Sequence, residues 1–226
     1  MLELPPTIST FVFDVYGTLF DVHSVKEKAD ELFDGKGTEI SEIWRRKQLE
    51  YSFLRQLMGN YETFSEVTKD SLKYALKQLA IPFSNKEVES LMVQYTSLHA
   101  YDEVQNVLST LKENGRVLAV FSNGSRDMLE PLVEQAGMKE YFHHIISVDD
   151  TKQYKPTPAS YTGVLKEIGV KREEVLFMSS NGWDISGAKN FGFHTAWINR
   201  NHLPQEELGL APDYTFDSLD GILDLL

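Results

Sequence analysis

The chain has 226 residues, 42% hydrophobic and 25% charged, which is the composition of an ordinary soluble globular protein. This length allows one large domain, or a core with a smaller inserted domain. A formal net charge of −12 argues against a nucleic-acid partner, and no run approaches the roughly 20 apolar residues that a membrane-spanning helix needs. The absence of cysteine excludes disulfides, thiolate nucleophiles and sulfur-ligated metals. The start MLELPPTIST lacks a basic region followed by an apolar one, so the predicted location is the cytoplasm.

The N-terminal part of the chain predicts one strand followed by a long helical stretch. Residues 10–16 (TFVFDVY) form a short β-rich apolar run that ends at Gly17. From about residue 23 to residue 98 the apolar residues recur at helical spacing. The helices expected in this stretch cover residues 38–60, 65–80 and 84–98. The last of them opens with a capping box from Ser84 to Glu87.

After about residue 100, predicted strands and helices alternate. Strands are expected within residues 116–125, 143–150, 175–180 and 194–200, with an edge strand at 213–218. Helices are expected at residues 107–115, 128–137, 158–170 and 185–192. Pro131 must either remove a hydrogen bond from its helix or lie in the first turn. Continuous apolar strands such as VLAVF and VLFM, each followed by a helix, indicate a parallel sheet covered on both faces.

This order of elements predicts an α/β fold. One strand, a helical excursion and then repeated strand–helix units are typical of a doubly wound parallel sheet, Rossmann-like, with an inserted helical cap subdomain. We expect residues 1–20 and 99–226 to form the core and residues 21–98 the cap. In such sheets, ligands bind beyond the carboxyl ends of the strands.

Polar side chains gather at four of these predicted strand ends. The four groups are Asp14 with Tyr16 and Thr18, the turn Ser122–Asn123–Gly124–Ser125, Lys155, and Ser179–Ser180–Asn181 with Asp184. Each group alone has an ordinary explanation as a turn former, a helix cap or a solvated lysine. Turn formation and helix capping do not readily explain why all four groups occur at successive strand ends.

The chemistry of these groups fits a hydrolase that forms a covalent intermediate. A carboxylate such as Asp14 can form an ester when cations and fixed donors lie beside it. Lys155 can hold Asp14 ionised, and the backbone N–H groups of the 122–125 turn suit an anion. Asn181 and Asp184 can orient water for a hydrolytic step. Asp14 is therefore the predicted nucleophile.

The segments DVYGTLFDVHSV, VFSNGS, YKPTPASY and VLFMSSNGWDISGAKNFGFHTAWINR together resemble the L-2-haloacid dehalogenases of the haloacid dehalogenase superfamily. The resemblance covers essentially the whole chain, including the cap sequence EISEIWRRKQLEYSFLRQLM with Arg45. It implies a haloacid dehalogenase core and a cofactor-independent homodimer. The implied activity is hydrolysis of short (S)-2-haloalkanoic acids to (R)-2-hydroxyalkanoic acids and halide.

The resemblance also implies a role for each matching residue. Asp14 attacks the halogen-bearing carbon, and water then hydrolyses the ester at the Asp14 carboxyl carbon. The residues implied to surround that ester, to bind or polarise water and to help place Lys155 are Thr18, Ser179, Asn181 and Asp184. The substrate carboxylate is implied to bind Ser122 and the backbone N–H groups after Asp14, at Val15 and Tyr16, and the departing halide to lie between Arg45 and Asn123. An active-site tyrosine is implied at Tyr161, and the apolar wall of the substrate pocket at Leu49, Phe64 and Trp183.

The pattern of residues alone leaves several of these positions open. Arg45, adjacent to Arg46 and Lys47, fits a surface arginine, and only the resemblance assigns it to the site. Core packing is the competing explanation for Phe64, Trp183 and Tyr161. Two departures from the family pattern, Gly182 where Ala is usual and His194 where Pro is common, put the substrate range in doubt.

Position 16 separates two activities within the superfamily. The phosphatases that the chain resembles more distantly have a second Asp there, as general acid for an alkoxide, whereas a halide leaves without a proton and this chain has Tyr16. Those phosphatases bind Mg²⁺ through an acidic pair, but the block SSNGWD has only Asp184, so we predict no metal requirement. The alternatives are a haloacetate- or fluoroacetate-selective dehalogenase, a phosphatase or phosphonatase of the same fold, and a non-catalytic binding protein.

Overall fold

The computed structural model describes residues 4–226 and contains an all-parallel, six-stranded sheet in the order β3-β2-β1-β4-β5-β6. The strands are β1 (Thr10–Phe13), β2 (Val117–Ser122), β3 (His144–Ser147), β4 (Val175–Ser179), β5 (His194–Ile198) and β6 (Tyr214–Phe216). Every residue of β1 and β4 is buried, as expected for strands covered on both faces. The predicted doubly wound α/β fold is confirmed.

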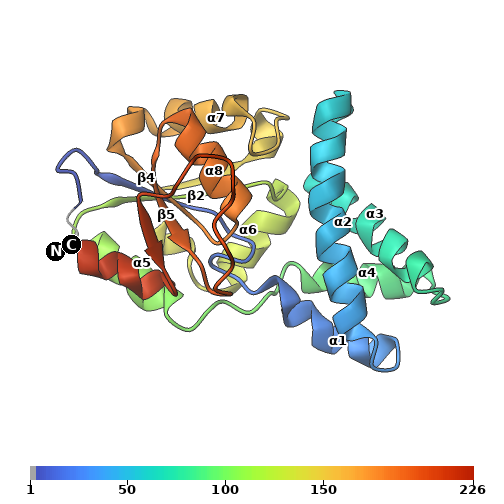
Figure 1. Ribbon diagram of the computed structural model, residues 1–226. Coiled ribbons are helices and arrows are strands. Elements are labelled where there is room, and N and C mark those ends of the chain that lie inside the picture. Colours follow the sequence, from blue (N-terminus) through green and yellow to red (C-terminus); the bar gives the residue numbers. More distant parts are fainter. Residues whose placement is uncertain (1–3) are drawn as a thin grey trace.

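Helices cover both faces of this sheet (Figure 1). They are α5 (Val104–Glu113), α6 (Arg126–Gln135), α7 (Pro158–Ile168) and α8 (Gly182–Phe191). Helices α7 and α8 contact each other above the sheet in Figure 1, whereas α5 packs against the C-terminal 3₁₀ segment η5 (Leu219–Leu225) below it. Strand β1 lies where the strand order reverses, so its carboxyl end is the expected position for a ligand.

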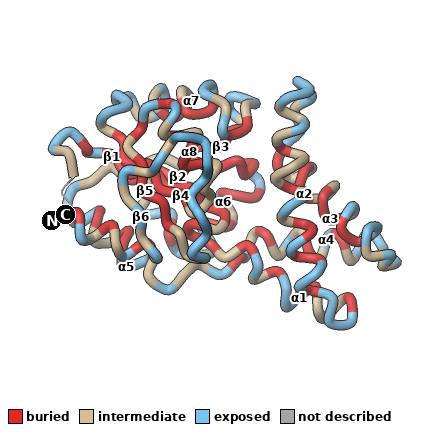
Figure 2. Tube along the Cα trace, viewed as in Figure 1, coloured by how far each residue is buried: buried red, intermediate tan, exposed pale blue. Residues whose placement is uncertain are grey.

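Four further helices form a separate bundle beside the sheet, on the right in Figure 1. They are α1 (Lys26–Leu32), α2 (Gly37–Met58), α3 (Phe64–Gln78) and α4 (Asn85–Gln94), preceded by the 3₁₀ turn η1 (Val22–Val25). Figure 2 shows buried residues along the helices of this bundle, and the buried Trp44 indole donates to the Thr68 carbonyl at 2.8 Å. The predicted domain limits at residues 20/21 and 98/99 stay a prediction, and residues 1–3 of the expected core lie outside the described residues.

The two chain segments that join the bundle to the sheet lie side by side. The Asp21 N–H donates to the His99 carbonyl at 2.8 Å, and the Tyr101 N–H donates to the Leu19 carbonyl at 3.1 Å. Within residues 4–226, no helix is both long enough and apolar enough to cross a membrane.

Most predicted elements are present, with shifted ends. The strand expected at residues 143–150 stops at Ser147, where the Ser147 hydroxyl accepts from the Asp149 N–H at 3.1 Å and the chain turns into the 3₁₀ segment η3 (Val148–Asp150). The helix expected from residue 185 begins at Gly182, so Trp183 and Asp184 belong to its first turn. The C-terminal segment η5 was not predicted.

Candidate active site

The site begins where β1 ends, at Asp14. The Asp14 N–H donates to the Met178 carbonyl at 2.9 Å, so the pairing of β1 with β4 holds Asp14 at the carboxyl end of the sheet. The chain then turns at Gly17, which has a φ of +88°, in the left-handed region that favours glycine. A Cβ at Gly17 would also lie 3.0 Å from the Ser180 hydroxyl oxygen. This tight turn brings Thr18 back beside Asp14.

The two oxygens of the Asp14 carboxylate have different partners. Three donors meet Oδ2, namely the hydroxyl of Thr18 at 2.9 Å, the amide of Asn181 at 3.0 Å and the hydroxyl of Ser179 at 3.2 Å. The Lys155 ammonium donates to Oδ1 at 2.8 Å. The structure therefore brings together residues from the ends of β1 and β4 and from the loop before α7 around one buried carboxylate.

Lys155 is the buried cation of the site. Its Nζ lies 2.8 Å from Asp14 Oδ1 and 2.6 Å from Asp184 Oδ2, and its side chain is 1% exposed. Burial acts to lower the pKa of Lys155, but the charges of Asp14 and Asp184 outweigh it and raise that pKa. The lysine is therefore an ammonium ion that links the two carboxylates.

Asp184 lies on the far side of Lys155 from Asp14. The Tyr161 hydroxyl donates to its Oδ1 at 2.7 Å, so both Asp184 oxygens have partners. Burial raises the pKa of Asp184 to about 6, with Lys155 acting in the opposite direction. Burial also raises the pKa of Tyr161, which keeps its hydroxyl protonated as a donor.

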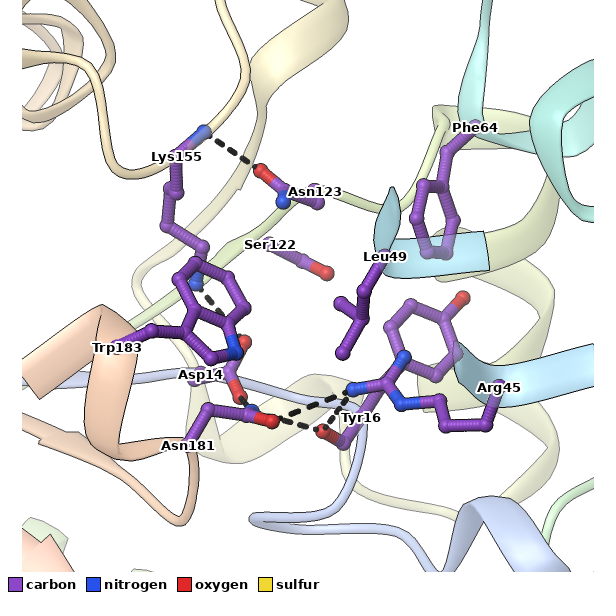
Figure 3. Close-up of a pocket in the computed structure, with 10 residues that line it drawn as sticks. All are labelled: Asp14, Tyr16, Arg45, Leu49, Phe64, Ser122, Asn123, Lys155, Asn181 and Trp183. Atoms are coloured by element: carbon purple, nitrogen blue, oxygen red, sulfur yellow. Dashed lines mark hydrogen bonds and ion pairs between the residues drawn. The ribbon is translucent and has the colours of Figure 1, made fainter. Parts of the chain in front are cut away.

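Figure 3 shows a small pocket between the sheet edge and α2. Ten residues line it: Asp14, Tyr16, Arg45, Leu49, Phe64, Ser122, Asn123, Lys155, Asn181 and Trp183. Its free volume of about 10 Å³ is room for roughly one water molecule. Its lining combines a carboxylate, two cationic side chains and an apolar wall.

Donors without partners point to an anion in this pocket. Among the described residues, the Tyr16 hydroxyl, the Asn123 Nδ2 and the Trp183 Nε1 are buried and have no hydrogen-bond partner in the structure. Burial raises the pKa of Tyr16, so its hydroxyl is a neutral donor. Buried donors normally have acceptors, so three of them lining one pocket, beside the Arg45 guanidinium, fit an anionic ligand.

The structure does not place every predicted site residue at the pocket surface. All the predicted apolar residues, together with Arg45, Ser122 and Asn123, line it. The predicted residues outside the lining are Val15, Thr18, Tyr161, Ser179 and Asp184. Thr18 and Ser179 donate to the Asp14 carboxylate, and Tyr161 donates to Asp184. The role implied for Tyr161 at the active site stays a prediction.

Two residues near the site were missed from the sequence. The guanidinium of Arg200 donates to the Thr18 carbonyl at 2.9 Å, and no local pattern around residue 200 signals this contact. Gln48 accepts from Arg45 at 2.8 Å, and its position three residues later on the same helix face was a usable signal.

Comparisons with known proteins agree with this geometry. A carboxylate, a lysine and hydrolytic side chains at the switch point of a parallel sheet define an α/β hydrolase with an aspartate nucleophile. Residues 8–192 match the model of the haloacid dehalogenase-like hydrolases, and the chain belongs to this family. The resemblance inferred from the motifs is thereby confirmed.

Individual relatives are similar over nearly their whole length. The chain is 42% identical to haloacetate dehalogenase H-2 of Moraxella sp. (strain B), covering 97% of this chain and 98% of the relative. It is 42% identical to an (S)-2-haloacid dehalogenase of Pseudomonas sp. (strain YL), covering 96% and 94%. The solved structure of the L-2-haloacid dehalogenase from Xanthobacter autotrophicus with chloropropionic acid covalently bound superposes with a TM-score of 0.90 at 37% identity, covering 96% and 98% of the two chains.

Proposed function

We propose that this protein hydrolyses short (S)-2-haloalkanoic acids to (R)-2-hydroxyalkanoic acids and halide through an ester on Asp14. The observation that carries the proposal is the Asp14 carboxylate, held by Lys155 and three further donors at the edge of a pocket with unpartnered donors. The names of the relatives at about 40% identity support the same substrate class.

In the first step, a carboxylate oxygen of Asp14 attacks C2 of the substrate, and the carbon–halogen bond breaks with its electron pair on the halide. Arg45 and Asn123 hold that halide, and no proton has to be supplied. Ser122 and the N–H groups of Val15 and Tyr16 bind the substrate carboxylate. Leu49, Phe64 and Trp183 surround the side chain at C2.

In the second step, water attacks the carbonyl carbon of the Asp14 ester. The donors on the two carboxylate oxygens, three neutral ones on Oδ2 and the Lys155 ammonium on Oδ1, are placed to stabilise the negative charge that develops as water adds. Lys155 gives a proton to Asp184 as it takes one from the attacking water, and the same proton then returns to the departing alkoxide. The second proton of the water stays on the regenerated Asp14 carboxyl group and is released to solvent. One displacement at C2 followed by hydrolysis at Asp14 inverts the configuration at C2.

A single turnover in H₂¹⁸O, with enzyme in excess, tests this route. We expect ¹⁸O in the Asp14 carboxylate by peptide mass spectrometry and an unlabelled hydroxyl oxygen in the first product. Asp14→Asn is the control and should release no halide. Label that appears directly in the first product would mean that water attacks C2, and the ester mechanism would be wrong.

Substrate range and metal independence are parts of the proposal with separate assays. Halide release from chloroacetate, fluoroacetate and 2-chloropropionate distinguishes a haloacetate-selective enzyme from one that accepts a methyl group at C2. The Lys155 ammonium lies between Asp14 and Asp184, so it supplies the positive charge that a phosphatase obtains from Mg²⁺. We expect full activity in EDTA, and p-nitrophenyl phosphate hydrolysis that requires Mg²⁺ would instead favour a phosphatase.

A further inference from the structure

The Arg45 guanidinium donates one short hydrogen bond, and the acceptor lies on the same helix. Arg45 Nη1 donates to Gln48 Oε1 at 2.8 Å. Its contacts toward the sheet are long, at 3.4 Å from Nη2 to Asn181 Oδ1 and at 3.5 Å from Nη2 to the Tyr16 carbonyl. The orientation of this cation over the pocket is therefore determined mainly by Gln48.

Gln48 is itself fixed by a chain of hydrogen bonds. Its side chain is completely buried, and its Nε2 donates to Thr68 Oγ1 at 2.7 Å. The Thr68 hydroxyl donates to the Phe64 carbonyl at 2.6 Å, so its single proton is used and its oxygen can only accept from Gln48. The Gln48 amide consequently has one orientation, with its NH₂ toward Thr68 and its oxygen toward Arg45.

A second contact strengthens this assignment. Burial raises the pKa of Tyr95 to about 12, while a hydrogen bond with the Gln48 side chain acts to lower it. Tyr95 is buried against Trp44, with ring centroids 4.8 Å apart. The Gln48 oxygen and the Gln48 NH₂ group thus each have a hydrogen-bond partner within the helical bundle.

We propose that Gln48 is a positioning residue that aims the Arg45 guanidinium at the departing halide, an inference that rests on the proposed function. Gln48 takes up one N–H of Arg45, which leaves the other Nη group directed at the pocket. A neutral amide orients the cation without cancelling its charge, whereas a carboxylate at the same place would offset it. Fixed orientation matters because a donor that is in place before the reaction stabilises the charge that develops in it.

Rapid-quench single turnovers test the proposal, because they separate ester formation from ester hydrolysis. Gln48→Met preserves the length of the side chain and removes both hydrogen bonds. We expect ester formation to slow by about tenfold or more, since small displacements of an aligned group have effects of this size. The loss should be larger with 2-chloropropionate than with 2-bromopropionate, because chloride is the poorer leaving group, and ester hydrolysis should stay within about twofold.

Two further variants keep the test valid if Gln48→Met folds poorly. Thr68→Val removes the acceptor for Gln48 Nε2 and should slow ester formation in the same direction. Gln48→Glu preserves an acceptor for Arg45 but adds a negative charge, so it should also slow ester formation. Ser71→Ala is the matched control, because its buried hydroxyl donates to the Thr68 carbonyl at 2.8 Å without contacting Gln48 or Arg45, and it should leave both steps unchanged.

A double-mutant cycle decides whether Gln48 acts through Arg45. In an Arg45→Ala background, Gln48→Met should cause no further slowing of ester formation, because coupled residues are not additive. Additive losses, or equal slowing of both chemical steps, would overturn the positioning role and leave Gln48 a packing residue. The wild-type enzyme is measured first, and absence of any ester there would overturn the proposed function itself.

Discussion

Among the single residues of the site, Lys155 offsets part of the negative charge of Asp14 and Asp184. One buried ammonium lies between two carboxylates, so the three side chains together carry one negative charge when all are ionised. An anionic substrate approaching Asp14 needs further positive charge, and in the pocket lining only Arg45 adds it. The substrate therefore binds between a negative nucleophile and a positive halide site, which favours the direction of displacement at C2.

The raised pKa of Asp184 predicts an acid limit of activity. Burial raises that pKa to about 6, so Asp184 gains a proton as the pH falls through about 6 and loses its ionic contact with Lys155. We expect kcat to fall with a midpoint near that pH. Because a carboxyl group with a raised pKa binds its proton more tightly when folded, protonation of Asp184 raises the free energy of unfolding, so this titration does not itself unfold the protein.

Tyr161→Phe provides the directional control for this prediction. The Tyr161 hydroxyl donates to Asp184 at 2.7 Å, and this bond acts to lower the pKa of the carboxyl group. Its removal should move the midpoint of the kcat profile to higher pH, while circular dichroism at the same pH values remains native. A midpoint that does not move, or moves down, would mean that another group sets the acid limit.

Which site residues could be predicted depended on whether they carry a local pattern. Asp14, Lys155 and Asn181 follow or precede predicted strands, and sheet topology alone brings such ends together. Arg45 lies on a polar helix face with two other cations beside it, so only the family resemblance indicated its role. Gln48 was missed because its spacing of three residues from Arg45 indicates a contact along the helix face, but its burial against Thr68 depends on packing with α3.

At the scale of elements, the predicted start of α8 was wrong at a point where the chain belongs to the site. Asn181 is the N-cap residue of α8, yet its side chain makes no capping bond, because its amide donates to Asp14 at 3.0 Å. Because Asn181 is assigned to the site, the predicted helix starts at Ile185 and misses the first turn with Trp183 and Asp184. By contrast, the capping box of Ser84 and Glu87 serves only its own helix, and it was predicted correctly.

The C-terminal part of α2 is tied to the loop that carries Lys155. Gln56 Oε1 accepts from the Tyr154 N–H at 2.7 Å, and Gln56 Nε2 donates to Gln153 Oε1 at 2.8 Å. The Tyr154 hydroxyl in turn donates to the Glu62 carbonyl at 2.7 Å, in the segment between α2 and α3. These contacts hold the helical bundle closed over the pocket.

Gln56→Ala should therefore weaken substrate retention more than chemistry. Leaving the Tyr154 N–H without its acceptor costs about 1–3 kcal/mol, so we expect KM to rise roughly tenfold with a smaller change in kcat. Hydrogen exchange at Tyr154 should become faster in the same variant. Gln78→Ala, on an exposed position of α3, is the control and should change neither quantity.

At the scale of the whole molecule, the arrangement of the bundle over the sheet could not be predicted from the sequence. The order of elements indicated that a helical segment is inserted after the first strand, and the structure has α1–α4 there. No periodicity, however, specifies that α2 brings Arg45 within 3.4 Å of Asn181, 136 residues further along the chain. That contact depends on how the bundle packs against the sheet.

The exposed apolar residues of α2 and α3 support the homodimer implied by the family resemblance. Leu57 and Met58 are 84% and 66% exposed, with Leu54 and Tyr74 nearby in the same helix pair. We expect a dimer by sedimentation velocity and a monomer for Leu57→Glu. Leu208 is also an exposed leucine but lies outside α2 and α3, so Leu208→Glu should remain a dimer. A wild-type monomer at micromolar concentration would refute the predicted homodimer.

The closed pocket also has a consequence for the pace of the proposed reaction. A free volume near that of one water molecule leaves little room for a haloacid in the conformation seen in the structure. We therefore expect the bundle to move away from the sheet to admit the acid and again to release the hydroxy acid and halide. Steps of this kind set kcat in many enzymes, so we predict that kcat falls as solvent viscosity rises.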